Sequence, residues 1–120
     1  MPVTLYERLG GHDGITRLVT DIVDNHYRNP LIKTRFEQIK DRAAVERHSA
    51  EFLCAGSGGP QAYSGRDLLT THKGMNISEQ ELVAAIDDIV MAMNKNQLDA
   101  SVQNEVVAIL YSLKGDVLRH

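Results

Sequence analysis

The chain has 120 residues and a formal net charge of −3 at pH 7, and this length fits one domain with a core of its own. No run of lysines and arginines occurs, which argues against nucleic acid or an anionic membrane as the main partner. The lone Cys54 cannot form an internal disulfide, the amino terminus lacks the apolar centre of a signal peptide, and no apolar run reaches ~18 residues. We therefore expect one cytoplasmic domain, residues 1–120, that does not enter a membrane.

Apolar residues recur at spacings of three and four along most of the chain, the pattern of amphipathic helices, and no strand pattern or internal repeat accompanies them. The sequence therefore predicts an all-α fold. The expected elements, in chain order, are a helical turn within 2–9 and helices at 13–28, 31–36, 41–55, 68–73, 78–95 and 101–118.

Capping residues set several of the expected boundaries. Asp41 is expected to cap the helix at 41–55, and Ser78 with Glu81 forms a capping box for the next long helix. Ser101 is expected to cap the last helix. Glycines and a proline in the stretch 56–65 break the chain between the helices at 41–55 and 68–73.

Two histidines, His48 and His72, lie on either side of this glycine-rich break. His48 falls on the apolar stripe of its helix, where it is a core histidine bonded to a backbone carbonyl, a second ligand, or a hydrogen-bond donor to something bound. His72 is either a surface histidine or a metal ligand. His12, His26 and His120 are expected to be structural or solvated, and Cys54 to be a small buried hydrophobe.

Two imidazoles do not complete a structural zinc site, which needs four nitrogen or sulfur ligands. They do complete the two axial positions of a haem iron, whose other four ligands come from the macrocycle. Phe36 is either an ordinary core residue or a ring stacked on such a flat cofactor.

The chain carries an ordered set of motifs: LYERLGG at 5–11, Phe36, EFL at 51–53, GGP at 58–60, YSG at 63–65 and TTHKG around His72. With this set it resembles the group I truncated haemoglobins over nearly its whole length. The resemblance implies a two-over-two helical sandwich around haem b. It pairs the helices at 13–28 and 41–55 on the distal side, and those at 78–95 and 101–118 opposite them.

The same resemblance implies the residues of the site. His72 falls on the proximal iron ligand, and His48 falls where similar cyanobacterial proteins place a sixth ligand. Tyr63, Arg66 and Lys73 are expected near the haem propionates. The remaining pocket residues implied are Phe36, Val45, Ser49, Phe52, Leu68, Ile77 and Ile86.

The distal side departs from the usual pattern of this family. Val23 stands where many members have a tyrosine that contacts the bound ligand, and Val45 and Ser49 replace a leucine and a glutamine. Leu113 stands where some cyanobacterial members attach haem covalently through a histidine, so no such bond is expected.

The functions implied are binding of O2, NO or CO at a six-coordinate iron, or electron transfer and detoxification of reactive species, including NO dioxygenation or a peroxidase-like reaction. Weak hydrogen bonding by Val23 and Ser49 argues against stable oxygen storage. The protein is expected to be a monomer served by an electron donor or reductase. A remote alternative is a cofactor-free helical interaction module.

Overall fold

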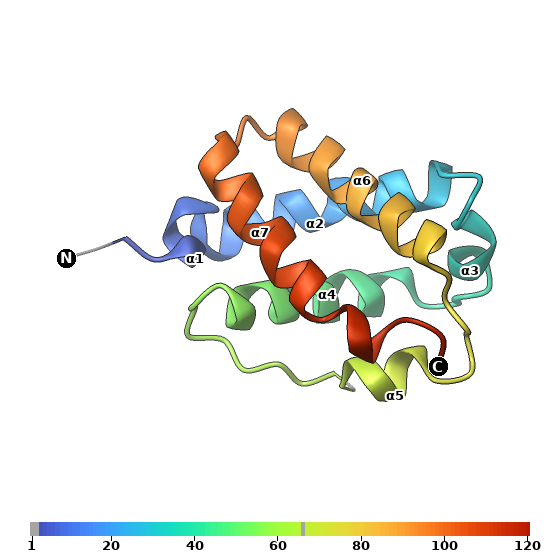
Figure 1. The fold of residues 1–120 in the computed structure, drawn as a ribbon. Coiled ribbons are helices and arrows are strands. Elements are labelled where there is room, and N and C mark those ends of the chain that lie inside the picture. Colours follow the sequence, from blue (N-terminus) through green and yellow to red (C-terminus); the bar gives the residue numbers. More distant parts are fainter. Residues whose placement is uncertain (1–2, 66) are drawn as a thin grey trace.

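The computed structural model describes residues 3–65 and 67–120, and its secondary structure there is helical (Figure 1). The elements are α1 (Leu5–Arg8), α2 (Gly11–Arg28), α3 (Lys33–Glu37), α4 (Arg42–Gly56), α5 (Leu68–His72), α6 (Glu79–Lys95), α7 (Ala100–Ser112) and the 3-10 turn η1 (Lys114–Asp116). Within the described residues no strand forms, and the extended pairing is one bridge between Ile77 and Leu118. The expectation of an all-α fold is confirmed. No helix in this part of the chain is both long and apolar enough to span a bilayer.

Helix α2 is the scaffold that joins the two halves of the fold, because it packs against both α4 and α6. Helix α7 packs on α6, so the molecule has two helical pairs, α2 with α4 and α6 with α7 (Figure 1). The stripe residues of α2 form the centre of one hydrophobic core, which includes Cys54 of α4, Met93 of α6 and Val106 of α7. The largest fully buried side chains are aliphatic or sulfur-containing: Ile15, Leu18, Met93, Val23, Val106 and Cys54.

A tight corner between α1 and α2 depends on glycine. Gly10 caps α2 in the left-handed region, at φ +98°, where residues with a β-carbon are strained. At Gly14, a β-carbon would lie 2.5 Å from the carbonyl oxygen of Leu9. This close approach lets α1 fold directly back onto the start of α2.

A buried polar cluster joins α2 to α6. The Nδ1 atom of His26 lies 2.8 Å from Oδ2 of Asp88, and both residues are buried. Asn29 donates its side-chain amide to both Asp88 carboxylate oxygens, and Asn25 donates to the Asp88 main-chain carbonyl. His26 is therefore a structural residue that is held by a partner, as buried polar groups require.

Most of the expected boundaries are close to those observed. Asp41 caps α4 by accepting a hydrogen bond from the amide of Ala44, and Ser78 with Glu81 forms the capping box of α6. Helix α2 begins two residues earlier than expected, and α3 lies slightly later than the expected 31–36.

The expected last helix, 101–118, was wrong at both ends. Asp99 rather than Ser101 is the cap, and its carboxylate accepts a hydrogen bond from the amide of Val102 at 2.9 Å. The helix ends at Ser112, whose hydroxyl donates to the carbonyl of Ile109. Such local bonding competes with helix continuation, and Gly115 follows within the 3-10 turn.

The corrected cap gives a direct test of the fold. Asp99→Ala should lower the free energy of unfolding by about 1 kcal/mol, because it leaves a first-turn amide of α7 without its acceptor. Ser101→Ala is the matched control, since Ser101 is exposed and accepts a hydrogen bond from Arg8 at the surface; its effect should stay within about 0.5 kcal/mol. Urea denaturation measures both. A larger loss in Ser101→Ala than in Asp99→Ala would contradict the assignment of the cap.

The stability should also depend on pH through His26. Burial lowers the pKa of His26 below its ordinary 6.5, outweighing the opposite effect of Asp88. His26 therefore binds a proton more readily in the unfolded chain than in the folded chain. As a result, the free energy of unfolding falls as the pH drops below about 6.5. His26→Gln should flatten this decline in urea denaturation between about pH 7 and 5, whereas His12→Gln, at an exposed position, should leave it unchanged. An identical decline in His26→Gln would show that His26 does not cause it.

Candidate cofactor site

His72 is the last residue of the short helix α5, and its ring is oriented by the main chain. Asp67 caps the helix by accepting a hydrogen bond from the amide of Thr70 at 2.7 Å. The Nδ1 atom of half-buried His72 lies 2.8 Å from the carbonyl oxygen of Leu68, one turn earlier. A carbonyl only accepts, so Nδ1 carries the proton and Nε2 of the neutral ring keeps its lone pair. This is the arrangement in which a histidine ligates a metal.

The chain that follows His72 is tied to the carboxyl terminus. Gly74 adopts φ +88°, which turns the chain away from α5. The amide of Asn76 donates to the carbonyl of His120 at 2.7 Å, and the amide of Arg119 donates to the carbonyl of Ile77 at 3.0 Å. Ile77 itself is buried. These two hydrogen bonds therefore fix the segment between α5 and α6 to the last residues of the chain.

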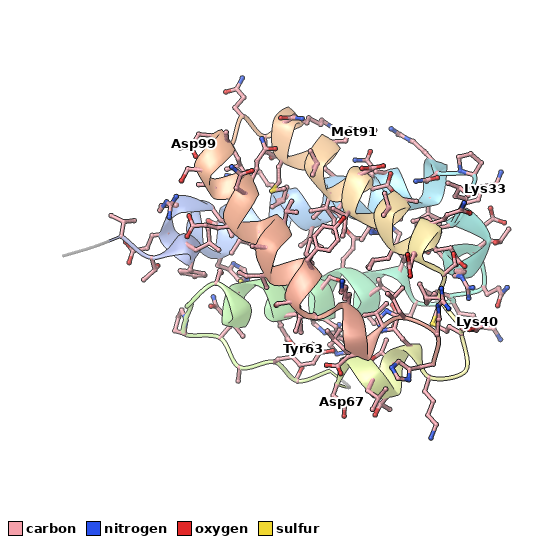
Figure 2. The ribbon with its side chains drawn as sticks, viewed as in Figure 1. Lys33, Lys40, Tyr63, Asp67, Met91 and Asp99 are labelled. Carbon is pink, nitrogen blue, oxygen red and sulfur yellow. The ribbon has the colours of Figure 1, made fainter. Side chains whose placement is uncertain are left out.

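His48 is half-buried on α4 and faces Tyr63 from the segment between α4 and α5. The two ring centroids are 6.4 Å apart with the rings nearly perpendicular, and Tyr63 makes a second edge contact with Phe52 at 5.3 Å. Figure 2 labels Tyr63 in this segment and Asp67 at the start of α5. The structure thus brings together three of the predicted site residues.

The position of Tyr63 is supported by its neighbour. Both the amide and the hydroxyl of Ser64 donate to Glu51 Oε1, at 3.1 and 2.6 Å. These two hydrogen bonds lower the pKa of the Glu51 carboxyl, so it remains ionised and a good acceptor at neutral pH. The segment that carries Tyr63 is therefore fastened to the outer face of α4.

Two of the four predicted distal residues on α2 and α4 are apolar. Val23 is buried in the core, and Val45 is half-buried against it. Ser49 is half-buried on the same helix as His48. Of these four predicted distal residues, His48 is the one with a ring nitrogen that could donate an electron pair or a hydrogen bond.

Phe36 lies against α2. Its ring stacks on His26 with centroids 4.9 Å apart and an interplanar angle of 19°, and it makes a tilted contact with Tyr27 at 5.9 Å. Its predicted contact with a cofactor stays a prediction. The role of the His26–Asp88 pair was missed from the sequence. His26 stands on the apolar stripe of its helix, where a polar side chain needs a partner, but Asp88 lies off the apolar stripe of its own helix, so the pattern does not indicate this partner.

The other predicted residues take ordinary positions around these groups. Ile86 is buried, Leu68 is half-buried and Lys73 is exposed. Arg66 lies outside the described residues. Cys54 is buried, and desolvation raises the pKa of its thiol, as expected for a small core residue.

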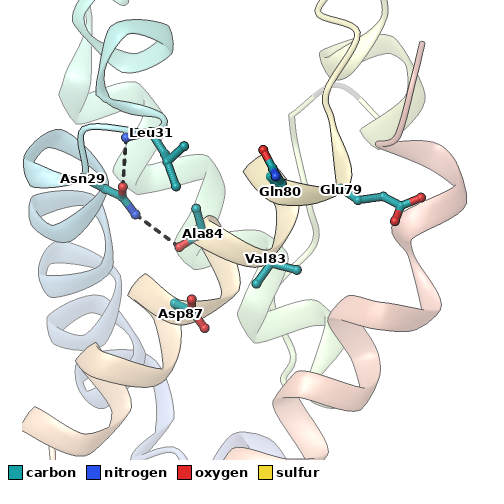
Figure 3. Close-up of a pocket in the computed structure, with 7 residues that line it drawn as sticks. All are labelled: Asn29, Leu31, Glu79, Gln80, Val83, Ala84 and Asp87. Carbon is teal, nitrogen blue, oxygen red and sulfur yellow. Dashed lines mark hydrogen bonds between the residues drawn. The ribbon is translucent and has the colours of Figure 1, made fainter.

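Two surface hollows lie between neighbouring helices. The first has a volume of about 620 Å³ and lies between the end of α2 and the start of α6 (Figure 3). It is lined by Asn29, Leu31, Glu79, Gln80, Val83, Ala84 and Asp87. The second, of about 690 Å³, lies between α2 and α4 and includes Thr16, Arg47 and Gln61. Neither is lined by His48 or His72.

The donor chemistry fits a haem. Across residues 3–65 and 67–120, no group of three or more His, Cys, Asp or Glu side chains is arranged to hold a bare metal ion. His72 instead offers one imidazole with Nε2 available and Nδ1 already bonded, and a haem iron needs at most two protein ligands because the macrocycle supplies the rest.

The comparisons with known proteins point to one family. The profile of the bacterial-like globins matches residues 4–119. The group 1 truncated haemoglobin of Tetrahymena pyriformis is 26% identical over 117 residues, which is 98% of this chain and 96% of that protein. A Nostoc protein named group 1 truncated haemoglobin GlbN is 26% identical over 96% of this chain and 97% of its own length.

The solved structures agree on the fold. The crystal structure of the Tetrahymena pyriformis protein in its Fe(III) form has a TM-score of 0.94 at 24% identity, covering 98% of this chain and all of that one. The 2/2 haemoglobin of Synechococcus, described with covalently attached haem, has a TM-score of 0.87 at 23% identity, covering 97% of this chain and 98% of that one. The chain belongs to the bacterial-like globin family, and its fold is the two-over-two sandwich of the truncated haemoglobins.

Proposed function

We propose that this chain holds haem b through His72 as the proximal iron ligand and binds diatomic molecules, O2, NO or CO, on the side of His48. Globins and their truncated relatives are haem proteins that bind small gaseous ligands. The observation that carries the proposal for this chain is the hydrogen bond from His72 Nδ1 to the carbonyl of Leu68. In the neutral ring this hydrogen bond places the proton on Nδ1 and leaves Nε2 available as an electron-pair donor.

The role of His72 is to donate an electron pair while its ring is held by the turn of α5. When bound, haem supplies an iron that takes up a diatomic ligand or an electron. Because Leu68 and His72 belong to the same five-residue helix, the orientation of the ring depends on the cap by Asp67 as well as on the hydrogen bond. Second partners of this kind also raise the basicity of a ligating imidazole.

We further propose that His48 occupies the opposite axial position when no external ligand is present. His48 is the only imidazole among the predicted distal residues, and Val23 and Val45 give the wall around it little polarity. A diatomic ligand then binds only after the His48 ring moves away, so its apparent affinity falls by the fraction of molecules in which the site is open.

The remaining predicted residues would surround the haem. Phe52 and Tyr63 contact one another beside His48, and Tyr63, Lys73 and Arg66 are proposed to reach the propionates. The proposed apolar and neutral contacts are Phe36, Val45, Ser49, Phe52, Leu68, Ile77 and Ile86. Lys73 is exposed directly after His72, which suits a cation that meets a carboxylate at the pocket mouth.

A second candidate function is electron transfer or detoxification of reactive nitrogen or oxygen species, fed by a reductase or other electron donor. Two imidazole ligands favour it, because the ligand set need not change when an electron arrives. The apolar residues Val23 and Val45 also offer no hydrogen bond that would retain oxygen. The protein is proposed to work as a monomer in either role.

The proximal assignment can be tested by chemical rescue. His72→Gly removes the donor, so the purified variant should lose most of its haem or show a changed absorption spectrum in both the ferric and ferrous states. Added imidazole should restore the spectrum by taking the place of the side chain. The exposed His12→Gly serves as the control and should resemble the unmodified protein. Unchanged absorption of His72→Gly without imidazole would refute the assignment.

The distal assignment predicts faster ligand binding when the competing ring is removed. His48→Ala should convert the ligand-free spectrum from six-coordinate low-spin to five-coordinate or water-bound. It should also speed CO binding by about tenfold or more, since closed sites no longer dominate. Stopped-flow mixing with CO measures the rate, and Ser49→Ala on the same helix is the control. Equal spectra and CO rates in His48→Ala and the unmodified protein would exclude His48 as a ligand.

The dioxygenase form of the second candidate function can be tested with nitric oxide. If the protein is an NO dioxygenase, ferrous protein equilibrated with oxygen and mixed with NO should form nitrate at a second-order rate far above the haem-free background. Stopped-flow absorption with nitrate analysis measures this, and the His72→Gly variant gives the control. A rate no higher than background would remove the dioxygenase function and leave ligand binding or electron transfer.

A further inference from the structure

The buried pair of His26 and Asp88 has no role in the proposed ligation of the iron, yet it is the most completely bonded polar group of the described core. His26 is 8% exposed and Asp88 4% exposed. The Asp88 carboxylate accepts from His26 at 2.8 Å and from Asn29 at 3.1 and 3.2 Å. An apolar pair of similar volume would also join α2 to α6, because a buried polar pair adds little net stability over well-packed apolar side chains. The pair therefore calls for an explanation other than stability.

The hydrogen bonds fix the His26 ring in one orientation. Desolvation lowers the pKa of His26, so the ring is neutral near pH 7 and its Nδ1–H donates to the carboxylate. The carboxylate itself cannot turn freely, because Asn29 holds both of its oxygens. The plane of the imidazole is consequently set by groups on two different helices.

The orientation of the His26 ring bears on that of Phe36, because the two side chains are in contact. The two rings are stacked 4.9 Å apart at 19°, and Tyr27 touches Phe36 from a tilted position at 5.9 Å. Phe36 belongs to α3, a helix of five residues that is too short to be stable without tertiary contacts. An ion pair between Arg35 and Glu81 ties the same short helix to α6, but Arg35 does not hold the Phe36 ring.

We infer that His26 and Asp88 are positioning residues for the haem: through the stacked imidazole they fix the ring plane that Phe36 presents to the cofactor. This inference rests on the proposed haem binding and on Phe36 as a haem contact. It explains why the core contains a polar pair at this position. An aliphatic residue in place of His26 would allow the Phe36 ring to rotate and would loosen the stacking of Phe36 on a planar ligand.

A double-mutant cycle on the haem-loaded protein tests this inference. His26→Gln retains an amide donor for Asp88 but removes the stacked ring, and Phe36→Leu removes the ring on which His26 acts. The measurements are the rate of haem transfer to excess apomyoglobin and the circular dichroism of the Soret band. His26→Gln should speed haem loss about tenfold when Phe36 is present and less than twofold in the Phe36→Leu background, because residues that act through one another are not additive.

The control is Glu81→Gln, which removes the charge from the ion pair that ties α3 to α6 and changes neither ring. Its effect on haem loss should be the same factor in both backgrounds. Asp88→Asn provides a second cycle with a variant of unchanged shape, in case His26→Gln does not fold. Equal factors for His26→Gln, or for Asp88→Asn, with and without Phe36 would overturn the positioning role while leaving haem binding intact. Failure of the unmodified protein to retain haem would instead overturn the proposed function, and this inference with it.

Discussion

The hydrogen bond between His72 Nδ1 and the carbonyl of Leu68 is the interaction on which the functional account depends. It lies inside a helix of five residues, whose start is fixed by the Asp67 cap. The ring is therefore oriented by local structure rather than by a distant side chain. Its other nitrogen remains available, and this supports the proposal that His72 is the iron ligand.

The second constraint is that α2 packs against both α4 and α6. Any polar residue on its buried faces needs a partner from a neighbouring helix, and His26 finds one in Asp88. The centre of the core is filled by aliphatic side chains and Cys54 and Met93. Both phenylalanines instead lie with other rings at the edges of α2 and α4, Phe36 on His26 and Phe52 on Tyr63.

Local rules account for what the sequence could predict. The long helices, the caps at Asp41 and Ser78 and the short helix ending near His72 follow from periodicity and capping chemistry. The last helix was misplaced, because Asp99 and Ser101 are both good caps and spacing does not choose between them. Its apolar stripe also continues to Val117, beyond the point where the backbone leaves the helix.

Side-chain contacts between different elements could not be predicted from one sequence. The stacking of Phe36 on His26 joins α3 to α2, and the contact of Tyr63 with His48 and Phe52 joins a loop to α4. Neither leaves a periodic signal. The resemblance to truncated haemoglobins supplied the fold and the expected ligands, whereas the bonding of His26 by Asp88 required the packed structure.

A crystal structure of the protein reconstituted with ferric haem tests the central claim most directly. The account predicts an iron bonded to Nε2 of His72, with Nδ1 of the same ring still donating to the carbonyl of Leu68. A haem whose iron is bonded to a different side chain, with the His72 ring turned toward solvent, would contradict it.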